Sequence, residues 1–175
     1  YAVDVKYDGD ANFTGVNETA NLNVDRINPG MNVIVENTTY GNSTTVNVIV
    51  NPEATGSVTI TVNGKTETAT LVGGRINLAV SGLAAGRYIA TVKYLGDGNF
   101  NEATANIEFV VSKISPDMTV DVKTVDNGGR ANVTVTVNTK ATGTVTITIN
   151  GTDYVAAINN GKAIVTVSDL AVGNY

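Results

Sequence analysis

The sequence predicts an all-β protein made of tandem β-sandwiches of about seven strands each, and three features of its 175 residues support this prediction. Segments of alternating apolar and polar residues recur along the whole chain, and they are rich in Val, Ile and Thr, which favour strands. Turn residues, chiefly Gly and Asn, separate these segments at short intervals, and no segment has a helical period. The third feature is an internal repeat of 87 residues.

The repeat is visible in single residues and in whole segments. Tyr1, Tyr88 and Tyr175 are 87 residues apart, and residues 56–64 (Gly-Ser-Val-Thr-Ile-Thr-Val-Asn-Gly) match residues 143–151 at the same spacing. A period this long suits an autonomous domain rather than a solenoid, so it predicts a tandem array. Residues 20–24 leave two alignments open, with residues 107–111 at the same spacing or with residues 105–109 if two residues are shifted.

The repeat predicts three divisions of the chain. Residues 1–24 would be the last two strands of a preceding sandwich, residues 25–111 one complete sandwich, and residues 112–175 the first five strands of a following one. The strands that we expect in the complete sandwich are residues 31–36, 44–50, 57–63, 66–71, 75–80, 88–95 and about 103–111. Alternation places Val58, Ile60 and Val62 on the inner face of the third strand. Asn63-Gly64 after it predicts a type I′ hairpin turn.

Two motifs of the complete repeat resemble a known family. They are Leu-x-x-Gly-x-Tyr at residues 83–88 and Val-Lys-Tyr-x-Gly-Asp-x-Asn-Phe at residues 92–100. Together they resemble the bacterial Ig-like repeats of group 3, which are abundant in large adhesin-like surface proteins of bacteria and methanogenic archaea. The resemblance implies an extracellular stalk, filament or adhesin on the cell surface, with neighbouring repeats or copies as partners and no catalytic residues. The first motif also resembles the tyrosine corner of Ig-type sandwiches.

Six residues of these motifs and their repeats are assigned structural roles. Tyr88 and Phe100 are expected to close the two ends of the complete sandwich, and Gly86 belongs to the corner that leads into Tyr88. Tyr1, Phe13 and Tyr175 mark the corresponding positions of the neighbouring sandwiches.

Composition excludes several classes of function. The chain has no Cys and no His, so thiolate chemistry is excluded and the usual general base at neutral pH is missing. The net charge is −5, and Lys and Arg are scattered singly, which argues against nucleic acid as a partner. No apolar run approaches the roughly 20 residues that a membrane span needs. We therefore expect no enzyme activity and no membrane insertion of this segment.

Two Asp-rich loops are weak candidates for calcium sites. Oxygen-bearing side chains alternate in each loop, at Asp8, Asp10 and Asn12 and at Asp97, Asn99 and Asn101. The twelfth position, where an EF-hand loop has its glutamate, is Thr19 in the first loop; in the second it is Glu108, which lies in a predicted strand. The simpler interpretation is a turn between two strands, with Phe13 or Phe100 covering the end of the core.

Six Asn-x-Ser/Thr sequons are candidates for glycosylation. Asn37 and Asn42 flank an expected exposed loop and are the better candidates; the others are Asn12, Asn17, Asn132 and Asn150. A carbohydrate- or protein-binding module is the alternative function, with host or cell-surface glycans as partners. The absence of Trp and the expected inward position of most Tyr residues argue against a stacked sugar site.

The divisions of the repeat allow two accounts of how neighbouring sandwiches join. In the first, the chain is a segment of a longer continuous array. In the second, residues 1–24 of one chain complete the last sandwich of another by strand addition. Residues 25–29 and 112–116 each place an Ile of the type usually buried shortly before a Pro, which predicts short and stiff joints between sandwiches.

Overall fold

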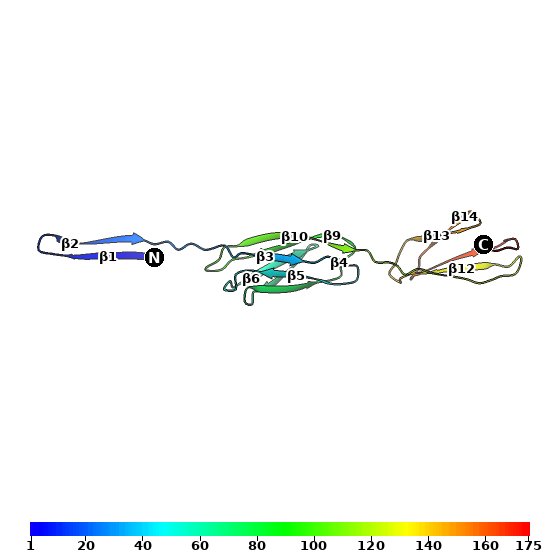
Figure 1. Ribbon diagram of the computed structural model, residues 1–175, viewed down its shortest axis with the longest axis horizontal. Coiled ribbons are helices and arrows are strands. Elements are labelled where there is room, and N and C mark those ends of the chain that lie inside the picture. The colour runs from blue at the N-terminus through cyan, green and yellow to red at the C-terminus, as the bar shows by residue number, and fades with distance from the viewer. The chain divides into compact units, whose positions relative to one another are not determined.

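The computed structural model describes all residues 1–175 and contains fifteen strands and no helix (Figure 1). The chain divides into two compact units, Tyr1–Lys113 and Ile114–Tyr175. The first unit contains a separate hairpin followed by a sandwich, which we call the central sandwich (β3 to β10). The all-β prediction is confirmed, and the chain has no helix that could cross a membrane.

The hairpin consists of β1 (Ala2–Gly9) and β2 (Thr14–Asn21). It forms a two-stranded sheet of its own, and no strand of the central sandwich pairs with it. Nearly every residue of both strands is exposed, including the apolar residues that alternate along them. An uncovered apolar face is therefore a feature of this hairpin.

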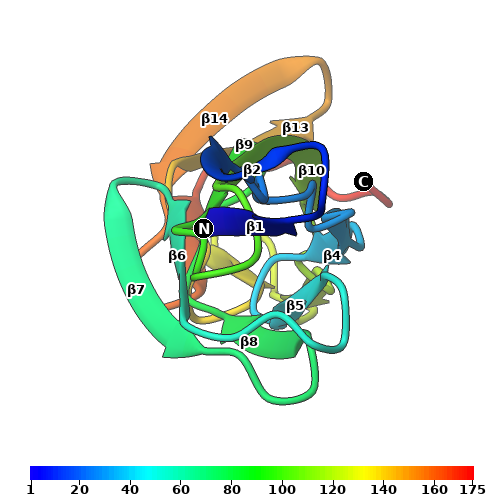
Figure 2. The same cartoon turned by 90° about the vertical axis from the view of Figure 1, so that its left-hand side faces the viewer.

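The central sandwich has two sheets. The three-stranded sheet has the order β3 (Asn32–Val35), β5 (Thr44–Ile49), β8 (Arg75–Val80). The five-stranded sheet has the order β4 (Thr38–Thr39), β10 (Ala103–Ser112), β9 (Gly86–Tyr94), β6 (Ser57–Val62), β7 (Lys65–Thr70). Figure 2 shows β5 and β8 on one side of this sandwich and β9 and β10 on the other.

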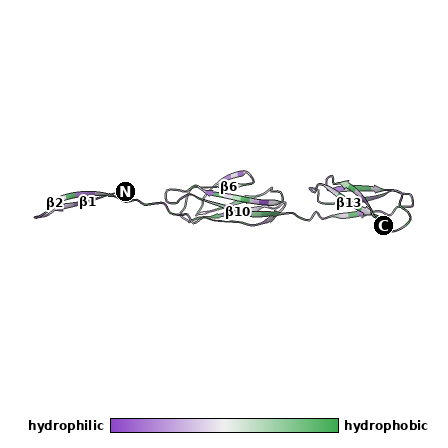
Figure 3. Ribbon diagram, turned by 90° about the horizontal axis from the view of Figure 1, so that it is seen from above, coloured by the Kyte–Doolittle hydropathy of each residue, from purple (hydrophilic) through white to green (hydrophobic).

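The core lies between the two sheets of the central sandwich and has the predicted inner faces. Val46, Val48 and Val50 are buried, and so are the inner residues of β6. Hydrophobic and hydrophilic residues alternate along the strands, as Figure 3 shows, because successive side chains point to opposite faces of a sheet. Burial of this alternate set stabilises the fold by about 25 cal/mol per Å² of apolar surface.

One predicted turn is confirmed, and the structure contains one short strand that was not predicted. Asn63 and Gly64 have φ angles of 49° and 74°, as the predicted type I′ turn requires. The two-residue strand β4 was not predicted. It is a short parallel pairing of Thr38 and Thr39 with the end of β10, and a pairing between residues so distant in sequence leaves no periodic signal.

The second unit has one three-stranded sheet, β11 (Thr119–Val122), β12 (Ala131–Thr136), β15 (Lys162–Val167), and one two-stranded sheet, β13 (Thr144–Ile149), β14 (Thr152–Ala157). These five strands begin and end 87 residues after β3, β5, β8, β6 and β7, respectively. The inner residues of β12 and β15 are buried, whereas those of β13 are only partly buried.

The joints differ from the prediction in the burial of their Ile residues. Ile27 is 57% exposed and Ile114 is 46% exposed, so neither side chain belongs to a core. What holds Ile27 is its backbone: its N–H donates to the carbonyl of Asn99 at 2.9 Å, and its carbonyl accepts from the N–H of Asn101 at 2.9 Å. The segment is anchored by a parallel bridge next to Phe100 and not by apolar packing.

Candidate functional site

The loop between β9 and β10 is organised by one carboxylate. Asp97 Oδ1 accepts the backbone N–H groups of Asn99 and Phe100, both at 2.8 Å. Its Oδ2 accepts the N–H of Thr55 at 2.8 Å and the hydroxyl of the same residue at 2.9 Å. Thr55 lies just before β6, so Asp97 ties this loop to the neighbouring strand. We call this set of contacts the Asp97 clamp.

The clamp explains the shifted pKa values of two groups. The backbone amides of Thr55 and Asn99 are the main reasons why the pKa of the Asp97 carboxyl is held well below its ordinary value. Tyr94 lies against the clamp and donates its hydroxyl to the carbonyl of Thr55 at 3.0 Å. Burial, followed by the neighbouring Asp97 carboxylate, raises the pKa of the Tyr94 phenol.

The loop between β1 and β2 is also organised by one carboxylate, that of Asp10. Asp10 Oδ1 accepts the N–H groups of Asn12 at 2.8 Å and Phe13 at 2.9 Å. Its Oδ2 accepts the hydroxyl of Tyr7 at 2.9 Å. These bonds, that of the Asn12 amide first, lower the pKa of the Asp10 carboxyl, and the bond to Asp10 raises the pKa of the Tyr7 phenol.

The remaining calcium candidates do not join these carboxylates in one cluster. Asp8 forms an exposed ion pair with Lys6 at 2.7 Å, and the Asn101 side chain donates to the carbonyl of Arg26 at 3.2 Å. No group of three or more Asp or Glu side chains gathers at one point of the chain. The observed bonds are those of Asx turns, the simpler of the two interpretations, and calcium binding stays a prediction.

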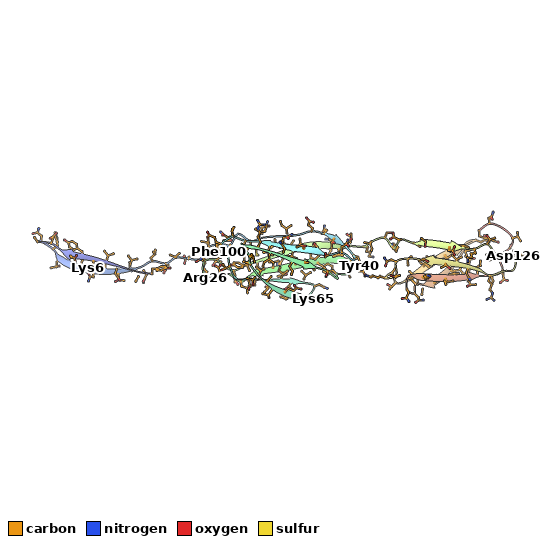
Figure 4. The ribbon with its side chains drawn as sticks, turned by 90° about the horizontal axis from the view of Figure 1, so that it is seen from below. Lys6, Arg26, Tyr40, Lys65, Phe100 and Asp126 are labelled. Carbon is orange, nitrogen blue, oxygen red and sulfur yellow. The ribbon has the colours of Figure 1, made fainter.

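The structural residues lie at the two ends of the central sandwich. The hydroxyl of Tyr88 donates to the carbonyl of Ala84 at 2.9 Å, which is the hydrogen bond of a tyrosine corner. Its ring stacks on Phe109 with the centroids 5.7 Å apart and lies 3.6 Å from the position that a Cβ on Gly86 would occupy. Phe100 is 2% exposed and lies at the end of the central sandwich where the chain enters from the hairpin (Figure 4).

Their repeats are not covered in the same way. Tyr175 donates its hydroxyl to the carbonyl of Ala171 at 2.8 Å, the same bond as in the first corner, yet its ring is exposed. Tyr1 and Phe13 are also exposed. Tyr7 and Tyr40 are exposed as well, so four of the seven Tyr residues are exposed and the prediction that most of them point inward is wrong. Tyr1 and Tyr7 belong to the uncovered hairpin, and Tyr40 lies in a turn.

All six sequon asparagines are exposed, but their side chains are engaged to different degrees. Asn37 Oδ1 accepts the N–H of Val110 at 2.7 Å, and Asn132 Oδ1 accepts the hydroxyl of Thr166 at 2.7 Å, so the amide nitrogens of both stay free of these bonds. Asn42 donates its amide nitrogen to the Thr39 hydroxyl at 2.9 Å. Asn150 occupies a hairpin turn with φ of 48°, and Asn12 and Asn17 lie on the hairpin β1–β2. Glycosylation at these positions stays a prediction.

A small hollow of about 200 Å³ opens between β6–β7 and β8 of the central sandwich. Its lining combines apolar residues such as Leu78 and Leu83 with Lys65 and Glu67, and it contains no aromatic side chain. A sugar could hydrogen-bond there but would have no ring to stack on.

The most distinctive surfaces of the chain are an uncovered face and an open edge. The uncovered face belongs to β1–β2, where Val5 is 59% exposed. The open edge belongs to β13, which pairs only with β14, although the corresponding strand β6 lies between β7 and β9. Unpaired strand edges of this kind are ready to pair with another strand.

Thr55 could not be found from the sequence, because nothing in the residues around it marks it as a partner of Asp97.

The comparison with protein families agrees with the fold of the central sandwich. Residues 32–112 match the family model described as bacterial Ig-like domain (group 3). The chain is also similar to a solved structure from work on "host cell surface retention of a 1.5-MDa bacterial ice-binding adhesin", with 20% sequence identity and a TM-score of 0.40. That similarity covers 96% of this chain and 63% of the other, so the chain spans less than two thirds of that structure. No curated protein matches the chain significantly.

Proposed function

We propose that the chain is a structural segment of an extracellular surface adhesin, stalk or filament, because residues 32–112 match the family model of the bacterial Ig-like domain (group 3). The single structural observation that supports a structural role is that the residues of the central sandwich serve its core packing and its turns. Its polar loop residues, Asp97 above all, are used to hold strands together. A module of this kind is suited to spacing and load bearing, and we propose no catalytic role for it.

The proposed arrangement is a linear array in which sandwiches follow one another along the chain. The backbone bridge of Ile27 to the loop of Phe100 supports a defined joint, because it fixes the segment that enters the central sandwich. The finer form of the proposal is that neighbouring copies join head to tail by strand complementation. Heterologous joining of this kind extends into an open filament unless its geometry closes.

Surface exposure in the producing cells tests this proposal. An antiserum raised against the purified chain should label intact cells, and brief protease treatment of those cells should remove the labelling. A cytoplasmic protein should be used as the control and should resist the same treatment. Labelling that requires permeabilised cells would contradict the proposal.

The alternative function is a carbohydrate- or protein-binding module, and the hollow beside Leu78 is the observation that favours it. A glycan array probed with the chain should then give saturable binding, which Glu67→Ala should reduce and Glu108→Ala, on the exposed side of β10, should not. Absence of binding across a broad array would remove the glycan form of this alternative.

A further inference from the structure

The segment through which the chain enters the central sandwich runs alongside the last strand, β10. We call residues 26–40 the entry segment. Ile27 forms a parallel bridge with Phe100, just before β10, and Thr38 pairs in parallel with Val111, near the end of β10. Both pairs are 73 positions apart (100 − 27 and 111 − 38), so the two segments share one register at both ends of the sandwich.

Parallel pairing places the points where the chain enters and leaves at opposite ends of the central sandwich. Arg26 and Phe100 lie at one end, and Tyr40, beside the end of β10, lies at the other (Figure 4). The sequence continues on both sides of the sandwich, before Arg26 and after Lys113. Tension along the chain therefore pulls the entry segment and β10 in opposite directions, along their own axes.

Three hydrogen bonds hold the entry segment at the first end. The N–H of Ile27 donates to the carbonyl of Asn99 at 2.9 Å, and the carbonyl of Ile27 accepts the N–H of Asn101 at 2.9 Å. The Asn101 side chain donates to the carbonyl of Arg26 at 3.2 Å. Because bonds between strands run across the strand direction, at a slant in parallel pairs, tension along the strands loads them in shear.

A side chain extends the pairing at the second end. The N–H of Tyr40 donates to the carbonyl of Ser112 at 2.8 Å, and the two residues of β4 pair with the last two residues of β10. One position before β4, Asn37 Oδ1 accepts the N–H of Val110 at 2.7 Å. This pair is again 73 positions apart (110 − 37), so Asn37 continues the register with its side chain. It is a positioning residue that lengthens a very short strand.

Between its two contacts with β10, the entry segment belongs to the other sheet. There it forms β3, which pairs with β5, and the carbonyl of Pro29 just before β3 accepts the N–H of Asn51 at 2.8 Å. Just after β3, the carbonyl of Glu36 accepts the hydroxyl of Thr44, a buried side chain, at 2.8 Å. The entry segment is thus bonded to both sheets and cannot slide along β10 without also sliding along β5.

We propose that the entry segment and β10 form a shear lock, through which the central sandwich resists tension along the chain. Each hydrogen bond makes only a modest net contribution by itself. Under shear, however, the bonds at both ends carry the load together and must break together, whereas bonds that are opened from one end break one at a time. The inference rests on the proposed structural function and names the element that would carry its load.

Pulling single molecules of the 175-residue chain at constant force in two directions tests the shear lock. The chain has no Cys, so two introduced Cys residues define the attachment points. Arg26→Cys with Lys113→Cys loads the lock in shear. Tyr40→Cys with Lys113→Cys pulls apart two neighbouring positions at one end and opens the lock bond by bond. At the same force, unfolding through residues 26 and 113 should be slower by roughly tenfold or more, because several bonds must break at once.

The design of these attachment points limits other effects. Arg26, Tyr40 and Lys113 are exposed, so the three Cys substitutions should not affect the fold, which circular dichroism checks. Both pairs enclose residues of the central sandwich alone, and the hairpin β1–β2 and the second unit therefore carry no load. The two measurements differ only in the direction in which the same strands are pulled.

Asn37 provides a matched pair of variants. Asn37→Leu keeps a similar size but loses the acceptor of the Val110 N–H, and it should speed unfolding through residues 26 and 113 by roughly five- to tenfold. Asn37→Asp keeps an acceptor oxygen and should stay within about twofold of the unchanged chain. Through residues 40 and 113 the bonds open in sequence, so Asn37→Leu should change that rate by about twofold at most.

The outcomes separate the inference from the function it rests on. Slower unfolding in shear, with a loss in Asn37→Leu that Asn37→Asp restores, supports the shear lock. Equal rates in the two directions would overturn it, and so would an Asn37→Leu effect that is absent in shear or equal in both directions, because a merely structural contact does not depend on the direction of pull. If Asn37→Leu fails to fold, the comparison of directions in the otherwise unchanged chain still decides.

Surface labelling of cells does not depend on the shear lock. Labelled cells together with equal unfolding rates in the two directions would refute only the inference. Failure of labelling would refute the proposed function, whatever the direction dependence of unfolding.

Discussion

Truncation of the corresponding Ile side chain in β6 or in β13 should have very different effects on stability. Ile60 is 1% exposed and lies in the middle of the central core, between the sheets. Ile147 holds the same place in β13 but is only partly buried, because no strand lies along the other edge of β13. The two substitutions Ile60→Ala and Ile147→Ala are therefore a matched pair at corresponding positions that differ in burial.

The magnitude follows from the atoms removed. Each change deletes three carbons, and at about 0.8 kcal/mol per buried CH₂ the transfer contribution for Ile60 is about 2.4 kcal/mol. The cavity left in a packed core adds to this, so we expect a loss of about 3 to 4 kcal/mol in the free energy of unfolding. For Ile147 the uncovered side already faces water, and we expect less than half of that loss at dilute concentration.

Urea unfolding followed by amide hydrogen exchange and mass spectrometry can separate the two units. Peptides of β9 and β10 report the central sandwich, and peptides of β12 and β15 report the second unit. With a urea m-value of roughly 1 kcal/mol/M for a domain of this size, Ile60→Ala should lower the midpoint by about 3 M or abolish folding. Equal losses for both variants would refute the reasoning, since they would show that β13 is already covered.

Further predictions concern single contacts of the central sandwich. Tyr88→Phe should lower its stability by about 1 kcal/mol through loss of the corner hydrogen bond, with Tyr40→Phe in an exposed turn as the control, measured by urea titration. The folded pKa of Asp97 is depressed, so its stabilisation is complete above the unfolded value near 3.8 and declines as pH falls below it; Asp97→Asn should flatten this acid dependence, and an unchanged profile would contradict the assignment. Gly74→Ala should destabilise more than Gly64→Ala, because its Cβ would lie 2.7 Å from a backbone carbonyl oxygen while that on Gly64 meets open space. Added calcium or EDTA should leave the thermal midpoint unchanged, since the Asp97 oxygens already accept hydrogen bonds; a calcium-dependent rise would restore the metal interpretation.

Much of the central sandwich could be predicted because its signals are local. Alternation identified Val58, Ile60 and Val62 as core residues, and the Asn63-Gly64 pair identified its turn, since both depend on neighbours in the chain. The tyrosine corner was equally accessible, because the hydroxyl of Tyr88 reaches a carbonyl only four residues upstream. The candidate site was less accessible. The Asp97 clamp joins residues 42 positions apart, and no periodicity indicates such a partner.

The sequence alone determined the all-β class, the alternating core faces and the spacing of 87 residues, because strand propensity and side-chain period are written in consecutive residues. Only the tertiary structure decided the pairing partners: that β6 lies between β7 and β9, that β13 has one free edge, and that Ile27 is held by its backbone while its side chain stays exposed. The physical reason is that strand pairing satisfies backbone groups common to all residues. Which strands meet is therefore set by the folded arrangement as a whole and not by any single motif.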